Sequence, residues 1–520
     1  MKMSKKSTVY VIALFAGLCA AAISFSTLFF PFGVDSACYL EQARSFMERG
    51  VFEVTLFGKE QADVVSVPDK LFPPGYPLLI AISSILLQQP VEVIAPFLSL
   101  AALMLLPAVI VFSFHRVLEL LPALWIGILV ALTPATVRHG YIAYSDTLSL
   151  VLVIYCVNRL LVADNKPATW FWLGLLTGSS YLLRNANLGL LLSICLYLFW
   201  QFIIEPENRK VIIRNGFVWL GANALLIVPW LIRNLLVFGK MQPYSMDPST
   251  VSLSENSHDY LEGQLDTLIS FSDLDALLAG KLWGISLLLL LLAVLAQQLI
   301  KTWQRWQKSE QQTFFIAVVY AAIGAAMVIA ARTKYEWGVH INARYALPYS
   351  CFIFVALAII FKNTTLKINT RYLGLGLAVT LLITRVCELP KLYEYDQYNQ
   401  TLIAAAKQIK ANPDVICTNL NGRFALSNYA FVYRILCAVP VRHVFPHFQQ
   451  NKFLDESLPG WVELGAKHGL VVSLFPYKDD KDSDLPLKQD RLMKLAASGW
   501  QVERNVKENL ILSRKANSSP

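Results

Sequence analysis

Long apolar segments separated by short polar ones recur along the chain up to about residue 388. A helix needs roughly 20 apolar residues to cross the hydrocarbon core of a bilayer. Segments near this length predict about eleven transmembrane helices. The pattern is typical of a polytopic α-helical membrane protein. We expect the spans at residues 9–30, 91–112, 121–137, 141–163, 168–183, 188–204, 214–238, 276–300, 313–331, 345–361 and 372–388.

The apolar stretch at residues 76–87 is too short to span, and it decides the orientation of everything after it. If it lies in the membrane interface, Lys and Arg concentrate in the loops on one side, as they do in cytoplasmic loops. If it crossed, this positive-inside bias would be reversed. We therefore expect an interfacial helix there, a cytoplasmic N-terminus and, after an odd number of spans, a C-terminus outside. Residues 9–30 are longer than the apolar core of a signal peptide, so this segment is expected to remain as an anchor.

From Leu389 the long apolar segments give way to a pattern typical of a soluble α/β domain. We therefore divide the chain into a transmembrane domain, residues 1–388, and an extracytoplasmic α/β domain, residues 389–520. The second domain either helps to hold an acceptor or caps the outer face of the first. It contains no Gly-rich phosphate loop, so nucleotide binding is not expected. Its β-rich runs are at residues 414–418, 435–441, 470–475 and 509–513, with helical patterns between them.

Composition agrees with the membrane assignment. Hydrophobic residues make up 55% of the chain and charged residues 16%. The formal net charge of +9 would by itself fit a nucleic-acid partner. The Lys and Arg residues, however, lie in short loops between apolar segments, where membrane insertion explains them. We therefore expect membrane lipids, and no nucleic acid, among the partners.

Two carboxylates and several arginines stand out against this apolar background. Asp35 follows the first span at the outer surface, and Asp146 lies about two turns inside the span predicted at residues 141–163. An ionised group in hydrocarbon is costly without a partner, which makes Asp146 a functional candidate; the alternative is a structural pair with an arginine or a helix cap. At the outer ends of spans, either a shared anionic ligand or snorkelling would explain the arginines. They are Arg138, Arg184, Arg233 and Arg344.

Several motifs occur in the order, and at roughly the spacing, seen in the GT-C superfamily of membrane glycosyltransferases. They are GVDSACYLEQARSFMERG, LFPPGYPLLIAIS, YSDTLSL, YLLRNANLGLLL, PWLIRNLLVFGK and NARYALPYS. The sequence resembles in particular the bacterial branch that groups dolichyl-phosphate-mannose protein mannosyltransferases with aminoarabinose transferases. In that family the first outer loop carries the essential acid, a Pro-Pro segment begins an interfacial helix, and the donor is a sugar on a polyprenyl phosphate. Asp35, Pro73 with Pro74, and Asp146 match those positions.

Two positions depart from the family pattern. Relatives often place a basic residue directly before the Pro-Pro, where this chain has Phe72 and carries Lys70 slightly earlier. Many also carry an arginine shortly before the second acid, where this chain has Tyr141, with Arg138 farther upstream. The roles of Lys70 and Arg138 are therefore open, whereas that of Asp35 is unaffected.

The resemblance implies an inverting transfer of a sugar from a polyprenyl phosphate to a hydroxyl. The acceptor hydroxyl must be made nucleophilic, and a carboxylate at the membrane surface, Asp35, can act as its general base. Arginine forks bind phosphate oxygens bidentately and stay charged, which assigns Arg184, Arg233 and Arg344 to the donor phosphate. Further candidates for the substrate site are Asp146, Arg138, Lys70 and Tyr76.

The expected partners are a polyprenyl-phosphate-linked sugar and an acceptor that is a lipid, a glycan or a protein. The expected location is the bacterial inner membrane, where the product would be a cell-envelope glycan. Some GT-C relatives use a divalent ion, but no spacing here demands one, so we expect no metal and no cofactor. A transporter or flippase of lipid-linked sugars stays an alternative, as does a glycan polymerase or ligase. A transporter should show polar residues along a path through the bilayer, whereas these spans are apolar on their cytoplasmic half.

Two further features of the outer side remain open. The polar segment at residues 239–275 has no apolar run able to span. Loops this long are usually lids, binding elements or disordered, so it either closes over substrate or is a mobile surface loop. Cys417 and Cys437 would form a disulfide only in an oxidising compartment.

Overall fold

The chain forms two compact units, each of which is built from several stretches of sequence. The structure is a computed structural model. It describes residues 4–27, 31–57, 64–243, 248–270, 296–335, 341–364, 375–376 and 378–387, with five short strands and the pair 434–435 farther on. The first unit comprises Met1–Leu28, Lys70–Tyr76 and Pro96–Leu392, and the second Phe29–Asp69, Pro77–Ala95 and Tyr393–Pro520.

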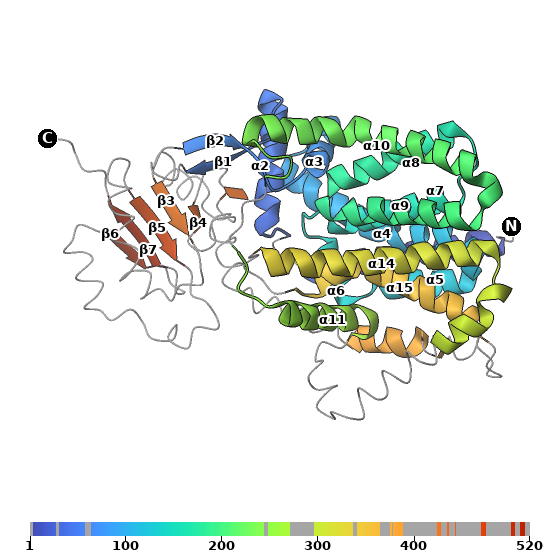
Figure 1. Ribbon diagram of the computed structural model, residues 1–520. Helices are drawn as coiled ribbons and strands as arrows, with labels where there is room; N and C mark the ends of the chain where they lie inside the picture. Colours follow the sequence, from blue (N-terminus) through green and yellow to red (C-terminus); the bar gives the residue numbers. More distant parts are fainter. Residues whose placement is uncertain are drawn as a thin grey trace. The chain divides into compact units, whose positions relative to one another are not determined.

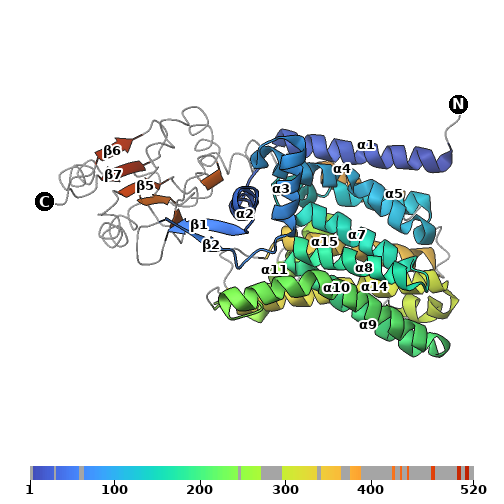
Figure 2. The same cartoon turned by 90° about the horizontal axis from the view of Figure 1, so that it is seen from above.

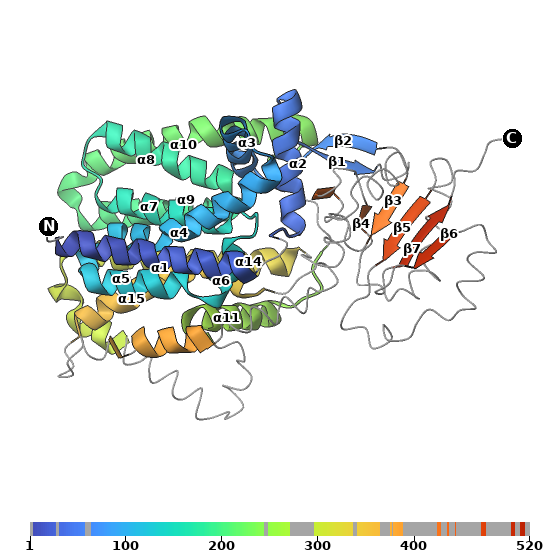
Figure 3. The same cartoon turned by 180° about the vertical axis from the view of Figure 1, so that it is seen from behind.

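The first unit is a bundle of apolar helices that run side by side (Figure 1). In lipid, every backbone N–H and C=O must be paired within the segment, so an apolar run becomes a helix. Figure 2 shows α1 and α5 along one side of the bundle and α9 and α10 along the opposite side, and Figure 3 shows α1 from behind. The helices are α1 (Lys5–Thr27), α4 (Val91–Leu118), α5 (Leu120–Ala131), α6 (Pro134–Gly140), α7 (Asp146–Leu161), α8 (Pro167–Leu183), α9 (Leu188–Ile204), α10 (Arg209–Phe238), α11 (Leu253–Ile269), α14 (Lys308–Lys334) and α15 (Ala343–Lys362), with short 3-10 turns η1 (Asn185–Asn187), η2 (Pro206–Asn208) and η3 (Trp303–Arg305).

The helices make the chain an integral membrane protein. Within the described ranges, six helices are long and apolar enough to cross a membrane, or seven if the bent pair α5 and α6 counts as one span. With 16 and 17 residues, α7 and α8 are shorter than a full span. The expected count of eleven stays a prediction, because the segments 276–300 and 372–388 lie wholly or partly outside the described residues.

The apolar run expected to span at residues 121–137 is not one straight helix. α5 ends and α6 begins on either side of a 63° bend. Pro134, the first residue of α6, has no backbone N–H and fixes its own φ, so it ends one helix and starts the next. The Thr133 hydroxyl donates to the Leu129 carbonyl at 2.9 Å, which satisfies one acceptor left by the end of α5. The span predicted at residues 121–137 is therefore a bent pair of helices, which is either a broken span or a re-entrant segment.

Small residues and buried hydrogen bonds hold α8 against α10. A Cβ added to Gly174 would lie 2.5 Å from the carbonyl oxygen of Trp219, so only glycine permits this approach. One turn farther along α8, the Thr177 hydroxyl donates to Asn223 Oδ1 at 3.0 Å. The Trp219 indole donates to the same hydroxyl at 3.0 Å. Such contacts drive association of helices in lipid, where apolar side chains gain little by leaving the lipid tails.

Part of the polar segment at residues 239–275 is a helix that is docked on the bundle. This helix, α11, places Gln264 against α15, where Nε2 donates to Ser350 Oγ at 2.7 Å. Arg385, which is 0% exposed, donates from Nη2 to two carbonyls in the last turn of α11. A cationic side chain at a helix C-terminus satisfies carbonyls that have no partner within the helix. Of the two readings of this segment, the mobile surface loop does not hold for α11.

The second unit contains the segment that follows α1, which is α2 (Val34–Arg49) followed by the antiparallel strands β1 (Glu53–Phe57) and β2 (Val64–Pro68). α2 ends at Gly50, whose φ of 73° is the left-handed conformation that closes many helices.

α3 (Gly75–Leu87) is the short apolar helix expected at the interface. Its 13 residues are too few to span a bilayer. Ile85, Leu86 and Leu87 at its C-terminal end are 56, 74 and 64% exposed. Apolar side chains this exposed on a short helix fit contact with lipid at the membrane interface.

The strands of the C-terminal region form a mixed sheet in the order β4-β3-β5-β7-β6 (Figure 1). β3 is parallel to β4 and β5, and β7 is antiparallel to β5 and β6. β5 and β7 lie at runs predicted as strands, whereas the run at 414–418 and the expected helices fall outside the described residues. The strands are β3 (Phe424–Ser427), β4 (Arg442–His443), β5 (Leu470–Leu474), β6 (Gln501–Arg504) and β7 (Leu510–Arg514).

Candidate functional site

Three helix ends of the first unit meet at Asp146. This residue begins α7, Arg184 follows the last residue of α8, and Arg344 lies in the first turn of α15. Arg184 Nη1 forms an ion pair with Asp146 Oδ1. Arg344 donates from Nε to Oδ1 at 3.1 Å and from Nη2 to Oδ2 at 3.2 Å. One carboxylate therefore holds two guanidinium groups, one of them as a bidentate fork.

The expected depth of Asp146 is corrected by this geometry. Because α7 begins at Asp146 rather than at Tyr141, the carboxylate lies in the first turn and not two turns inside the helix. The N–H groups at a helix start favour a negative charge there. Asp146 is paired with arginine, and this pair is compatible with a functional role as well as with a structural one.

Burial and charge make this cluster suited to an anion. The side chain of Asp146 is 2% exposed, and those of Arg184 and Arg344 are 16 and 15% exposed. Two guanidinium groups converge on one carboxylate at the end of the helices. Arginine is less strongly hydrated than lysine and matches the oxygen geometry of phosphate, so this pair is suited to a phosphate ligand.

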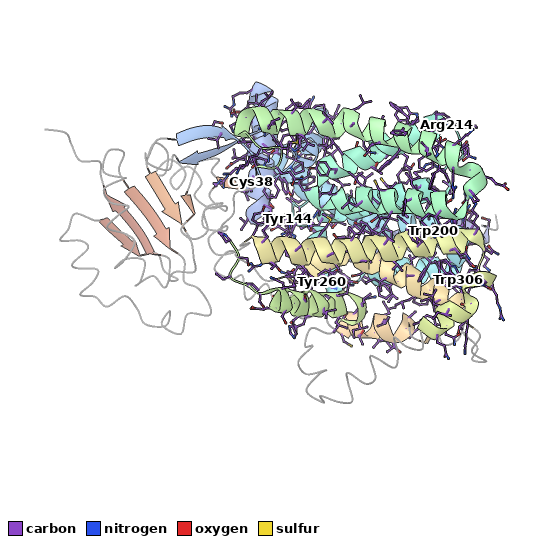
Figure 4. The ribbon with its side chains drawn as sticks, in the orientation of Figure 1. Cys38, Tyr144, Trp200, Arg214, Tyr260 and Trp306 are labelled. Carbon is purple, nitrogen blue, oxygen red and sulfur yellow. The ribbon has the colours of Figure 1, made fainter. Side chains whose placement is uncertain are left out.

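Aromatic rings line the arginine side of the cluster. Arg344 Cζ lies 3.9 Å from the centroid of the Tyr144 ring, a cation–π contact. The His139 ring is stacked on Tyr144 with 6.2 Å between centroids. Figure 4 shows Tyr144 at one end of the bundle and Trp200 and Trp306 at the opposite end. The sequence analysis did not single out Tyr144, although it lies beside the acid in the motif YSD.

Tyr76, a candidate for the substrate site, is fully buried beneath the segment that leads to Asp146. Its hydroxyl is 3.3 Å from Ser99 Oγ, which donates to the Tyr144 carbonyl at 2.9 Å. Burial raises the pKa of the Tyr76 hydroxyl, which therefore stays protonated. In this position Tyr76 supports the backbone before Asp146.

Two asparagines after Arg184 hold the end of α8 in place. Asn185 Nδ2 donates to the Leu71 carbonyl at 3.1 Å, which ties α8 to the chain that precedes α3. Asn187 Nδ2 donates to the Ser180 carbonyl at 2.8 Å. The signal for these contacts was present in the motif RNAN, because amide side chains next to a helix end commonly bond to backbone groups.

Arg233 lies near the end of α10 between two aromatic rings. Its Cζ is 4.7 Å from the Trp230 ring centroid and 5.2 Å from that of Phe238. Nη1 donates to Asn234 Oδ1 at 2.8 Å. An arginine among aromatic side chains at a helix end is typical of an interfacial anchor, so these contacts fit snorkelling as well as ligand binding.

Asp35 belongs to the second unit, where it lies in the first turn of α2 and is partly exposed. The Gly33 N–H donates to Ser36 Oγ at 3.0 Å, which fixes the start of the helix. Lys70 is exposed in the turn before α3, and Arg138 is partly exposed in α6. The structure thus brings Asp146, Arg184 and Arg344 together and carries the other candidates on separate elements.

One group within the described part of the chain offers three ligand atoms to a cation. His258, Asp259 and Glu262 lie on α11 with these atoms within 4.8 Å of one another. No pattern in the sequence predicted this group. Clusters of this kind are common at protein surfaces without an ion, and we assign it no role.

No protein-family model matches the sequence, and no curated protein matches it. The three-dimensional fold does have matches, and it is the fold of the GT-C membrane glycosyltransferases that the sequence motifs resemble.

Three solved structures illustrate this likeness. ArnT from Cupriavidus metallidurans, bound to undecaprenyl phosphate, is similar with a TM-score of 0.61 and 11% identity over 99% of this chain and 100% of that one. The archaeal oligosaccharyltransferase AglB from Archaeoglobus fulgidus was solved in complex with an inhibitory peptide and a dolichol-phosphate. It is similar with a TM-score of 0.52 and 13% identity over 89% of this chain and 69% of that one. The arabinofuranosyltransferase AftD from Mycobacteria is similar with a TM-score of 0.51 and 15% identity over 100% of this chain and 40% of that one. Identities this low establish a common fold.

Proposed function

We propose that this protein is an inverting glycosyltransferase that moves a sugar from a polyprenyl phosphate to a hydroxyl at the outer face of the bacterial inner membrane. The observation that carries the proposal is the convergence of two largely buried arginines, Arg184 and Arg344, on Asp146 at the ends of three helices. A lipid phosphate is the anion that a bilayer presents at the end of a helix bundle, and arginine forks match its oxygens. Two neighbours in fold, ArnT and AglB, were solved with undecaprenyl phosphate and a dolichol-phosphate.

The reaction is a single displacement at the anomeric carbon of the sugar. Asp35 takes the proton of the acceptor hydroxyl, whose oxygen then bonds to C1. The bond from C1 to the phosphate oxygen breaks, and its electron pair leaves with the polyprenyl phosphate. Arg184 and Arg344 stabilise this anion as its charge develops. One displacement without a covalent intermediate inverts the configuration at C1.

Asp146 prepares the site in this mechanism. It holds both guanidinium groups in place before donor binds, so little reorganisation is needed when the leaving phosphate forms. Because two arginines already neutralise this carboxylate, the site needs no divalent cation there. The proposed substrate site also includes Arg233 as a further ligand of the phosphate, together with Arg138, Lys70 and the support from Tyr76.

The proposed arrangement in the membrane follows the positive-inside bias of the loops. The N-terminus is cytoplasmic, residues 1–388 form the membrane domain and residues 389–520 an extracytoplasmic α/β domain. The acceptor is a hydroxyl of a lipid, a glycan or a protein.

Donor consumption in detergent separates this proposal from a transporter. Purified protein should convert a polyprenyl-phosphate sugar to polyprenyl phosphate in micelles, where no gradient exists, as followed by mass spectrometry. Arg344→Gln removes a charge-assisted contact worth roughly 1.5–3 kcal/mol, so donor use should fall about ten- to a hundredfold. Arg214→Gln is the matched control, because Arg214 lies at the opposite end of the bundle from Tyr144 (Figure 4). No conversion in micelles, with movement of the intact donor across vesicle membranes, would contradict the transferase and favour a flippase.

A further inference from the structure

The C-terminal region holds the helix that carries Asp35. Arg434 donates from Nε to Glu41 Oε1 at 2.7 Å and from Nη2 to Oε2, so both arms of its fork bind one carboxylate of α2. The side chains of Arg434 and Glu41 are 13 and 11% exposed. Arg434 lies in the stretch of chain between β3 and β4, far from α2 in sequence. A bidentate pair this well buried is a specific contact rather than a loose surface pair.

A second contact joins the same two segments. Arg44, about one turn after Glu41, donates from Nη2 to the carbonyl of Ile435 at 3.2 Å. Ile435 is 2% exposed. Arg44 also pairs with Glu92 in the first turn of α4. Residues 434–435 are therefore bonded to α2 twice, once through the side chain of Arg434 and once through that of Arg44.

The contact lies close to Asp35 along the helix. At 1.5 Å per residue, Glu41 is about 9 Å from Asp35 along the axis of α2. The Arg434 side chain also interacts with Cys38, which lies one turn after Asp35. Arg434 therefore reaches to within one turn of the carboxylate.

We infer that Arg434 is a positioning residue for Asp35, acting through Glu41 to fix the first half of α2. This inference rests on the proposed function, in which Asp35 is the general base. A base must lie within hydrogen-bond reach of the hydroxyl, and a displacement of about 1 Å can lower the rate on the order of a hundredfold. The C-terminal region is then part of the catalytic architecture, in addition to any contact that it makes with an acceptor.

Alkylation of Cys38 tests the contact without any assay of transfer. Burial raises the pKa of the Cys38 thiol, so the full-length parent protein should react slowly with a maleimide, as measured by peptide mass spectrometry. The Arg434 charge lowers the pKa of this thiol, so the quantity to compare is the rate constant of the thiolate, taken from the pH dependence of alkylation. Arg434→Ala and Glu41→Ala should each raise this rate constant by about tenfold or more, and the double variant should react no faster than either. Arg49→Ala is the matched control on the same helix, because its side chain is 46% exposed and its contacts with Glu53, Ser45 and Ser66 stay within α2 and the two strands that follow. Parent-like alkylation of Arg434→Ala would overturn the inference.

Kinetics then test the consequence for Asp35. Arg434→Ala should lower kcat by about tenfold or more and leave the KM for the donor within about twofold, since the arginines assigned to the phosphate belong to other helices. Arg434→Lys, which keeps the charge but not the fork, should recover part of kcat. An Arg434→Ala protein with parent kcat would overturn the positioning role even if alkylation rises. If the parent itself turns over no donor while Arg434→Ala still exposes Cys38, the proposed function fails and the contact between Arg434 and α2 stands.

Discussion

Replacing Asp146 by Asn should destabilise the folded protein more than removing either of its arginine partners. The Asp146 side chain is 2% exposed and holds Arg184 and Arg344, whose side chains are 16 and 15% exposed. Asn keeps the shape but not the charge, so two nearly buried guanidinium groups lose the counter-charge that Asp146 supplies. Removing one partner of a buried ion pair costs about 3–5 kcal/mol.

A double-mutant cycle with Arg344→Gln measures this dependence. Arg344→Gln alone should cost less, about 1.5–3 kcal/mol, because Arg184 still pairs with Asp146. In the double variant the loss of Arg344 also removes repulsion between the two guanidinium groups. The loss of unfolding free energy in the double variant should therefore be about 1–3 kcal/mol smaller than the sum of the losses in the two single variants. Arg49 and Glu53, 46 and 22% exposed, form a matched surface pair whose coupling should stay below about 1 kcal/mol.

The assay is reversible unfolding of the purified variants in mixed micelles, with the denaturing detergent as the variable. Losses for Asp146→Asn and Arg344→Gln that add within about 0.5 kcal/mol would refute the reasoning. An Asp146→Asn variant no less stable than Arg344→Gln would refute it as well. Either result would mean that the carboxylate does not hold the arginine pair.

Three further predictions concern the packing of a glycine, the need for a metal ion and the topology in the membrane. Gly75→Ala should lower the midpoint of thermal unfolding, because a Cβ there would lie 2.6 Å from the Leu182 carbonyl oxygen, whereas Gly221→Ala, with nothing within 4 Å, should not; equal midpoints would contradict this. Donor conversion should stay within about twofold after treatment with EDTA, because arginines rather than a cation neutralise Asp146; loss of activity that is restored by one divalent ion would contradict it. A reporter that is active only in the periplasm should work when fused after Pro520, and activity of a cytoplasm-only reporter there would mean that residues 76–87 cross the membrane.

The sequence was sufficient where a single chemical pattern decides the structure. The length of the apolar run at residues 76–87 predicted a short interfacial helix, and α3 has that length and exposes its apolar end. Charges at helix ends singled out Arg184 and Arg344, which the structure brings together on Asp146.

Two elements differ from what the length of the apolar segments predicts, and local chemistry explains both. The run at residues 121–137 is long enough to span, yet Pro134 breaks it, because the missing N–H outweighs apolar continuity. Segment 239–275 is polar, yet α11 forms there because α15 and Arg385 supply partners for its polar groups.

Ion pairs between residues that are far apart along the chain could not be predicted from the sequence, for a different reason. Arg344 and Asp146 are 198 positions apart, and Arg434 and Glu41 are 393 apart. Charge type restricts which residues can pair, but only the fold decides which of many arginines meets a given carboxylate. Burial of both partners is equally a property of the packed chain, so neither the strength nor the identity of these pairs could be read from local pattern.

Turnover by the Asp35→Asn variant tests the central claim most directly. With a polyprenyl-phosphate sugar and a competent acceptor, this variant should fold and bind polyprenyl phosphate as the parent does. It should transfer sugar at least about a hundredfold more slowly, the loss expected for a general base. The anomeric configuration of the parent's product, determined by NMR, should be inverted relative to the donor. Turnover near the parent rate by Asp35→Asn, or a product with retained configuration, would contradict the account.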